Sequence, residues 1–425
     1  MLLKDHLTGE FRLTPLTPFH IGSGDRYCDI DYEIRRDEFI VKDINKWLDD
    51  YTGDPEEAVK ILEAGAALGK KFERYRIAYN GPAPNGGGPQ SKAATGAPTT
   101  FKDKDATPFY NPFADAFGKK EEPAAAKAAK VTPKPAPAPQ PAGETVGEVR
   151  AFIKDSFGRP YLPGSSIKGA IRTALAYQLC EHYAPGPPVL ERLRKARGLQ
   201  SKATLGAGAV ETLFGKNPSI DVLKALVIRD SPPLDMGGRF AMVHIQVQSV
   251  RNDKLQVKSA APIYAECLMP SQPPIAIPFY VDQFVLREDK ELGQVFGHRT
   301  ADLLGDPTAL VGALKAFSQK LCAIEKDFYL THGRQDAANF FNGYIGKNDI
   351  ILPISFGAGW YAKTLGARLE PEELQEIRDY YEQQHKPIGR PGVKLFPKSR
   401  KFACTSAGGK SYRPMGWCKL EVVWK

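Results

Sequence analysis

The sequence predicts an α+β fold of the ferredoxin-like kind, arranged in two parts. Segments with strand character outnumber helical ones, and the clearest strand, residues 241–250, alternates apolar and polar side chains. Strands and helices do not alternate as they would in a doubly wound parallel sheet. Because 425 residues exceed one small domain, we expect an N-terminal domain over residues 1–285 and a smaller α+β domain over 286–425.

Each element is predicted from its hydrophobic period and its boundary residues. Ile167, Ile171 and Leu175 recur at helical spacing and predict the helix at residues 166–183. Asp54 and Gly69 are suited to begin and end a second helix, at residues 55–68. The predicted strands are residues 11–16, 38–41, 149–154, 225–229, 241–250, 264–268 and 275–281, and the predicted helices are 55–68, 166–183, 308–328 and 371–383.

A Pro/Ala/Gly-rich block covers residues 80–147. It has too few large apolar side chains to offset the entropy lost on ordering, so we expect a flexible insertion within the N-terminal domain.

The net charge of +9 is concentrated at the C-terminus. Residues 386–425 carry ten Lys or Arg and one acidic residue, whereas the rest of the chain has 48 charges of each sign. Such a basic segment indicates a polyanion-binding surface. A solvated tail is the alternative, but Phe402, Trp417 and Trp424 are aromatic residues that a tail does not need.

Other features narrow the class of protein. The six cysteines are scattered and form no His/Cys cluster, which indicates free thiols and neither a metal site nor a cofactor. No signal peptide and no apolar run of membrane-spanning length is present, so we expect a cytoplasmic protein without a membrane partner.

Three glycine-rich turns cover residues 18–24, 162–172 and 356–364. In the second, Gly164 permits a sharp turn before a helix whose free N–H groups suit a phosphate. Lys168 and Arg172 then share one helix face. An ordinary capped helix with exposed basic residues is the alternative. Ala170 excludes a nucleotide-binding P-loop, because that motif requires Lys at this position.

These motifs together resemble the RAMP superfamily of CRISPR proteins, and within it the fifth Csm subunit of type III-A effectors. The segments that carry the resemblance are PFHIGSG (18–24), DY (31–32), LPGSSIKGAIRTAL (162–175), LFG (213–215), RDS (229–231), GAGW (357–360), KT (363–364), PKSR (397–400) and PMGW (414–417). The long insertion departs from the pattern, as does Ser355, where another glycine is expected.

The resemblance implies RRM-like (ferredoxin-like) RAMP modules and a non-catalytic subunit. It implies a position at the end of the backbone filament, at the 3′ part of the CRISPR RNA, and a role in guide maturation for antiviral defence. The implied partners are CRISPR RNA, the repeated Csm backbone subunit and other Csm subunits, with a host trimming nuclease as a further candidate. The implied RNA contacts are His20, Gly22, Ser23, Gly24, Gly164, Ser165, Ser166, Lys168, Arg172, Lys363, Lys398 and Arg400.

A metal-independent endoribonuclease is the alternative function. Such an enzyme needs a general base and a general acid, and His20 is the candidate, supported by Lys168 or Tyr27. We favour a structural role, in which His20 packs at a strand end and hydrogen-bonds the backbone. Asp25, Asp29 and Asp31 do not have a recognised metal-binding spacing.

Overall fold

The computed structural model describes residues 6–35, 37–63, 68, 70–82, 146, 149–182, 213–215, 218–258, 262–270, 273–288, 297–383, 387, 389 and 392–425. The predicted insertion at residues 80–147 therefore lies almost entirely outside the described residues. None of the helices in these ranges has the length and apolar character needed to cross a bilayer.

The centre of the molecule is an antiparallel sheet, sheet A, in the strand order β12-β15-β1-β11-β7. Along the chain, the elements β1-α3-β7-β11-α8-β15 form a βαββαβ unit, and its strands lie in the ferredoxin-like order 4-1-3-2. The bounds are β1 (His6–Pro15), α3 (Gly164–His182), β7 (Leu226–Ile228), β11 (Ile275–Asp282), α8 (Pro307–Thr331), β12 (Ile350–Pro353) and β15 (Trp417–Trp424).

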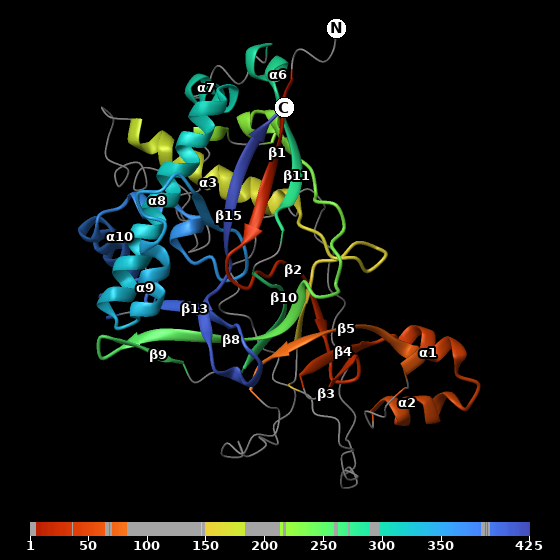
Figure 1. Cartoon of the computed structure of the whole chain (residues 1–425). Coiled ribbons are helices and arrows are strands. Elements are labelled where there is room, and N and C mark those ends of the chain that lie inside the picture. Colours follow the sequence, from red (N-terminus) through yellow and green to blue (C-terminus); the bar gives the residue numbers. More distant parts are fainter. Residues whose placement is uncertain are drawn as a thin grey trace, which may run out of the picture.

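A ten-stranded sheet, sheet B, is built from the segments that connect these elements (Figure 1). Strands β2 to β6 come between β1 and α3, β8 to β10 between β7 and β11, and β13 and β14 before β15. Their bounds are β2 (Gly22–Tyr27), β3 (Tyr32–Arg35), β4 (Glu38–Lys42), β5 (Glu73–Asn80), β6 (Val149–Phe152), β8 (Phe240–Arg251), β9 (Lys254–Val257), β10 (Ile263–Leu268), β13 (Ser399–Cys404) and β14 (Tyr412–Pro414).

Both sheets take strands from either side of the predicted boundary between residues 1–285 and 286–425. In sheet A, β15 pairs with β1, and in sheet B, β13 pairs with β8. The boundary thus divides the βαββαβ unit between its third strand and its second helix. The described strands after residue 286 therefore complete the two sheets and do not form a separate sheet.

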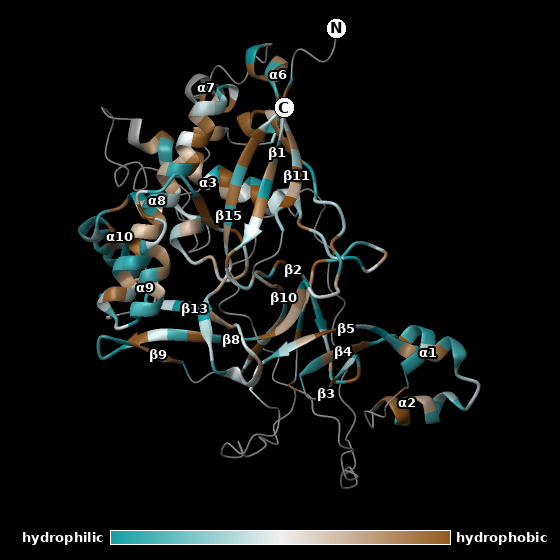
Figure 2. Ribbon diagram, viewed as in Figure 1, coloured by the Kyte–Doolittle hydropathy of each residue, from teal (hydrophilic) through white to brown (hydrophobic). Residues whose placement is uncertain are grey.

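One continuous core joins sheet A to its helices. Phe11 of β1 stacks on Phe279 of β11 with ring centroids 4.2 Å apart, and Tyr177 of α3 packs on Phe317 of α8. Brown stretches are interspersed with teal and white ones along β1, β11 and β15 (Figure 2), as expected for strands that turn one face to the core. The remaining helices are α1 (Ile44–Asp50), α2 (Pro55–Glu63), α6 (Gln283–Glu288), α7 (Gly297–Gly305), α9 (Gln335–Asn342) and α10 (Pro371–Gln383).

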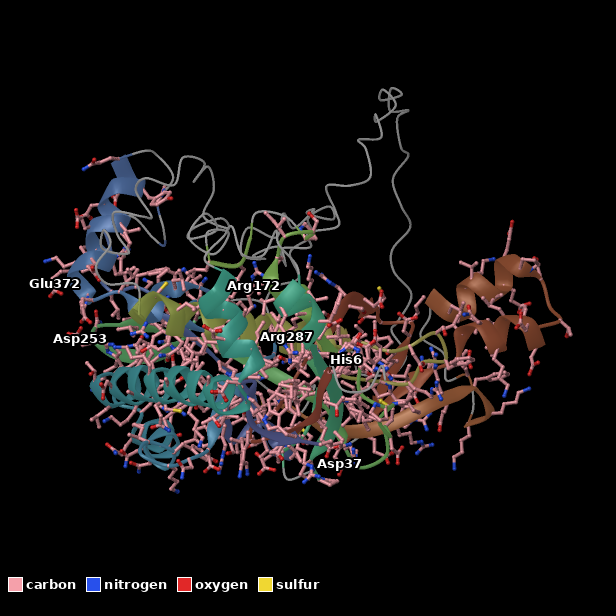
Figure 3. All side chains as sticks on the ribbon, turned by 90° about the horizontal axis from the view of Figure 1, so that it is seen from above. His6, Asp37, Arg172, Asp253, Arg287 and Glu372 are labelled. Carbon is pink, nitrogen blue, oxygen red and sulfur yellow. The ribbon has the colours of Figure 1, made fainter. Side chains whose placement is uncertain are left out.

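Helices α1 and α2 form a separate small layer around Trp47, Ala58 and Phe72. Viewed from above, they lie at one end of the molecule and α10 lies at the other (Figure 3). The α+β, ferredoxin-like expectation is confirmed, and the strongly periodic segments, such as α10 and β8, were predicted to within a residue or two. The sequence did not predict strands β2, β3, β5, β9 and β12 to β15 or helices α1, α6, α7 and α9.

Candidate nucleic-acid interface

The first and third glycine turns meet where the two sheets join. The Phe356 N–H donates to the His20 carbonyl oxygen at 2.8 Å, and the Gly416 N–H donates to the Pro18 carbonyl oxygen at 2.9 Å. Gly357 has φ +102° and Gly359 has φ +82°, which favour glycine at both positions. Segments more than 300 residues apart in sequence therefore lie side by side at this junction.

Two cations lie beside the half-buried ring of Phe356 at this junction. The Arg150 guanidinium lies 4.9 Å from the centre of the Phe356 ring, and the Lys401 ammonium lies 4.0 Å from it. Arg26 of β2 is directly opposite Arg150 in the β2–β6 pairing. We call Arg26, Arg150, Phe356 and Lys401 the junction surface. An aromatic ring with cations beside it has the chemistry that binds single-stranded nucleic acid.

The first turn lies beside the junction surface on an exposed strand. Gly22, Ser23 and Gly24 are exposed in β2, which pairs with β6 at the end of sheet B. A Cβ atom at Gly22 would lie 2.9 Å from His20 Nε2, so glycine lets the strand pass close to the imidazole. Gly24 has φ +104°. These backbone groups are exposed, as a contact to an RNA backbone requires.

His20 itself is buried, with 2% of its surface exposed. Its Nδ1–H donates to the Glu266 carbonyl oxygen at 2.7 Å, and Phe152 and Phe356 pack edge-on against the ring. Burial lowers the pKa of His20 to about 4, so the imidazole is neutral at pH 7. The structural role predicted for His20 matches this geometry, and the side chain does not present a general base or a contact to RNA at the surface.

A buried polar network lies next to His20. The Glu266 side chain is fully buried, and it accepts hydrogen bonds from the Tyr75 hydroxyl, the Lys154 ammonium and the Phe152 N–H. Tyr27 bonds both Tyr75 and Lys154. Lys154 thus supplies the positive charge that this buried carboxylate needs. The network joins β2, β5, β6 and β10 beneath the first turn.

The N-terminus of α3 is already occupied by a side chain of the protein. The Gly164 N–H donates to Asp230 Oδ1 at 2.8 Å, and the Ser166 N–H donates to the Pro163 carbonyl oxygen. Ser165 is exposed and Ser166 is half-buried. The Asp230 carboxylate takes the position that a phosphate would need at the first N–H group, which leaves Ser165 as the exposed group at this helix end.

Lys168 and Arg172 face the protein, on the side of α3 that meets β7 and the segment before it. The Lys168 ammonium donates to the Leu226 carbonyl oxygen at 2.8 Å, and burial lowers its pKa. Arg172 forms an ion pair with Asp221, and its guanidinium lies 4.5 Å from the Phe214 ring centre. Both cations thus stabilise the packing of α3, which the sequence reading missed because their partners are about 50 residues away.

The three C-terminal candidates have different environments. Lys363 is exposed and Lys398 is half-buried. Arg400 is buried, and its Nε lies 2.7 Å from Glu325 Oε2 while its guanidinium lies 3.8 Å from the Phe328 ring centre. Arg400 therefore holds β13 against α8 and is not available to a phosphate. The aromatics Phe402 and Trp417 are also buried, so this basic segment is part of the fold.

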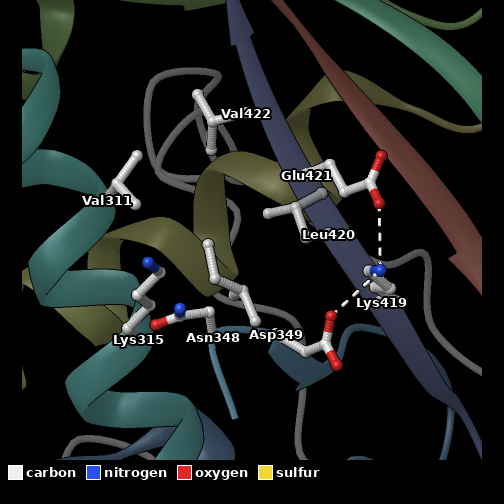
Figure 4. Close-up of a pocket in the computed structure, with 9 residues that line it drawn as sticks. Val311, Lys315, Asn348, Asp349, Lys419, Leu420, Glu421 and Val422 are labelled. Atoms are coloured by element: carbon white, nitrogen blue, oxygen red, sulfur yellow. Dashed lines mark ion pairs between the residues drawn. The ribbon is translucent and has the colours of Figure 1, made fainter.

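A shallow pocket of about 210 Å³ lies between α8 and β15 (Figure 4). Lys419 lies at its edge and forms ion pairs with Asp349 at 2.9 Å and with Glu421 at 3.0 Å. Two carboxylates thus neutralise this cation, which makes the pocket a poor candidate for binding a polyanion.

Comparison with known proteins identifies the family. The RAMP superfamily model matches residues 12–272. A CRISPR system Cms protein Csm5 from Streptococcus thermophilus is 30% identical over 172 residues, covering 40% of this chain and 39% of that protein. The Csm5 of Mycobacterium tuberculosis strain H37Rv is 27% identical over 232 residues, covering 51% of this chain and 52% of that protein. The matches thus span about two-fifths to half of the length of these relatives.

Two solved structures share the fold over nearly the whole chain. A chain in the cryo-EM structure of a type III-A Csm–crRNA–target RNA ternary complex is 20% identical with a TM-score of 0.63, covering 97% of this chain and 100% of that one. The chain in the crystal structure of T. onnurineus Csm5 is 19% identical in sequence with a TM-score of 0.54, and the match covers 96% of this chain and 99% of that one. From the family match over more than half of its residues, this chain belongs to the RAMP superfamily.

Proposed function

We propose that this chain is a Csm5-type subunit that binds CRISPR RNA in a type III-A effector. In this role it is a non-catalytic protein of a cytoplasmic ribonucleoprotein. It caps the backbone filament at the 3′ part of the guide, assists guide maturation, and contacts the repeated Csm backbone subunit and other Csm subunits. The similarity to Csm5 proteins from two organisms supports this assignment.

The junction surface is the observation that carries the RNA-binding part of the proposal. Arg150 and Lys401 approach one Phe356 ring from two different strands, beside exposed glycine backbone. Contacts of this kind recognise phosphates and stacked bases without reading a sequence. We therefore expect single-stranded RNA to bind with strong salt dependence and little sequence preference.

A double variant tests this surface. Arg150→Ala with Lys401→Ala removes two cations, so the affinity for single-stranded RNA falls by about tenfold, with the slope of log K against log[salt] smaller by about 1.4. The control, Lys46→Ala with Lys60→Ala, makes the same change in net charge on the exposed α1 and α2 and leaves both quantities unchanged. Equal losses in the two double variants would mean that RNA binding depends only on net charge.

Co-purification tests the assignment to an effector complex. The tagged full-length chain, expressed in its own host, is expected to bring down a small RNA of uniform 5′ end together with several RAMP-type proteins. A strain without this chain is expected to contain guides with altered 3′ ends. Recovery of the tagged chain alone, without RNA, would exclude the proposed role.

A further inference from the structure

A short hairpin between β6 and α3 presents an aromatic side chain to solvent. Phe157, at the tip of this hairpin, is 78% exposed, and the next most exposed aromatic among the described residues, Phe284, is 60% exposed. Lys154 and Pro160 form a bridge at the base of the hairpin. Its sequence neighbours Ser156, Gly158 and Arg159 contribute no large apolar side chain to the tip of the hairpin.

Hydrogen bonds hold the tip of the hairpin in one conformation. Asp155 Oδ1 accepts from the Phe157 N–H and the Arg159 N–H, both at 2.9 Å, and Asp155 Oδ2 accepts from Arg159 Nε at 2.8 Å. Gly158 has φ +75°, which lets the chain reverse direction. The ring is therefore presented to solvent by an ordered turn, and little conformational entropy is lost when a ligand contacts it.

Two guanidinium groups lie at this turn, and one of them is beside the ring. The Arg159 guanidinium lies 5.0 Å from the Phe157 ring centre. The Arg74 guanidinium packs against Gly158, where an added Cβ atom would lie 2.3 Å from Arg74 Nη2. The Arg159 guanidinium is also paired with the Asp155 carboxylate, so Arg74 is the cation at this turn that can attract a flanking phosphate, while the exposed Phe157 ring can stack on one base.

The hairpin also continues directly from the strand that pairs with the first glycine turn. Phe152 pairs with Gly22, and the Ile153 N–H donates to the Ile21 carbonyl oxygen at 2.8 Å. An RNA strand that contacts the exposed backbone of Gly22 to Gly24 therefore lies near the base of this hairpin.

We propose that Phe157 is a stacking platform for one unpaired base of the bound RNA. This inference rests on the proposed RNA-binding function and adds to it a contact that is independent of charge. Because the contact is a stacking one, every base has the π-face that it requires, and no sequence preference results.

The test uses the full-length protein and a single-stranded RNA that carries one 2-aminopurine. With Phe157→Ala we expect about 5- to 100-fold weaker binding and an unchanged salt slope, because no cation is removed. Phe157→Trp is expected to retain the wild-type affinity and to quench the 2-aminopurine fluorescence. Phe284→Ala, which removes the other strongly exposed aromatic, serves as the matched control and binds as the wild type does.

The outcomes separate this inference from the proposed function. If the wild type binds RNA and Phe157→Ala binds equally well, the stacking role is wrong and the proposed function stands. If the wild type does not bind RNA at low salt, the proposed function fails, and the stacking role fails with it. A Phe157→Ala protein that binds RNA normally but no longer assembles with its partner subunits would show that the ring contacts protein.

Discussion

At the scale of single residues, burial gives His20 a pH-dependent effect on folding stability. The folded state keeps the pKa near 4, whereas the unfolded chain has the ordinary value of 6.5, so only the unfolded chain takes up a proton between these values. The stabilising effect is complete above pH 6.5 and is lost as the pH falls toward 4. Between pH 6.5 and pH 4, the contribution of His20 to the free energy of unfolding changes by up to about 3 kcal/mol.

The His20→Gln variant tests this effect. Its free energy of unfolding, measured in urea between pH 7.5 and 4.5, is expected to depend less on pH than that of the wild type. RNA affinity at pH 7.5 is expected to remain close to that of the wild type for folded protein, because His20 is buried. Loss of an intrinsic RNA-cleaving activity in this variant would instead favour the endoribonuclease alternative.

Arg400 and Lys398 are two residues apart, but the structure predicts that replacing them with Ala has different effects on folding stability. Arg400→Ala leaves the buried Glu325 carboxylate without its cation, which costs about 3–5 kcal/mol of folding stability. Lys398→Ala is expected to change stability by about 0.5 kcal/mol or less, as for other surface substitutions. Urea unfolding of both variants measures the difference, and equal stabilities would contradict the importance of the Arg400–Glu325 pair.

At the scale of elements, two glycines in α3 have opposite roles. A Cβ atom at Gly164 would lie 2.3 Å from the Ile228 carbonyl oxygen, which is backbone, so Gly164→Ala costs about 1–3 kcal/mol. Among the described residues, no atom outside the helix's own backbone lies within 4 Å of a Cβ atom at Gly169, so Gly169→Ala stabilises the helix by about 0.5–1 kcal/mol. Thermal unfolding of the two variants distinguishes these effects, and a stabilising Gly164→Ala would mean that α3 does not pack closely on β7.

At the scale of the whole molecule, the last strand completes the central sheet. β15 lies between β12 and β1, with seven residue pairs along β1 from Gly9–Trp424 to Pro15–Cys418. A chain that ends after Gly416 is therefore expected to lose cooperative unfolding, because β1 and β12 both lose a neighbour. A chain that lacks only Lys425 is the control. Circular dichroism during heating compares them, and a cooperative transition in the shorter chain would contradict this role.

Much of the fold could be predicted from local patterns. The amphipathic segment that became α10 and the alternating segment that became β8 carry their own periodicity, so neither required knowledge of a partner. The glycine turns were also visible as motifs. By contrast, β2 contains Gly22 and Gly24 and no apolar alternation, so its sequence resembles a turn, and only pairing with β6 makes it a strand.

Contacts between distant residues decided which of the candidate residues are exposed and which are paired inside the protein. The sequence by itself determined the α+β class, the basic C-terminal segment and the glycine turns, because composition and local periodicity are properties of short segments. Only the tertiary structure brought Phe356 between Arg150 and Lys401 and placed Asp221 beside Arg172 and Glu325 beside Arg400. Whether a cation faces solvent or a buried carboxylate depends on residues about 50 to 110 positions away, and local patterns contain no information about such pairs.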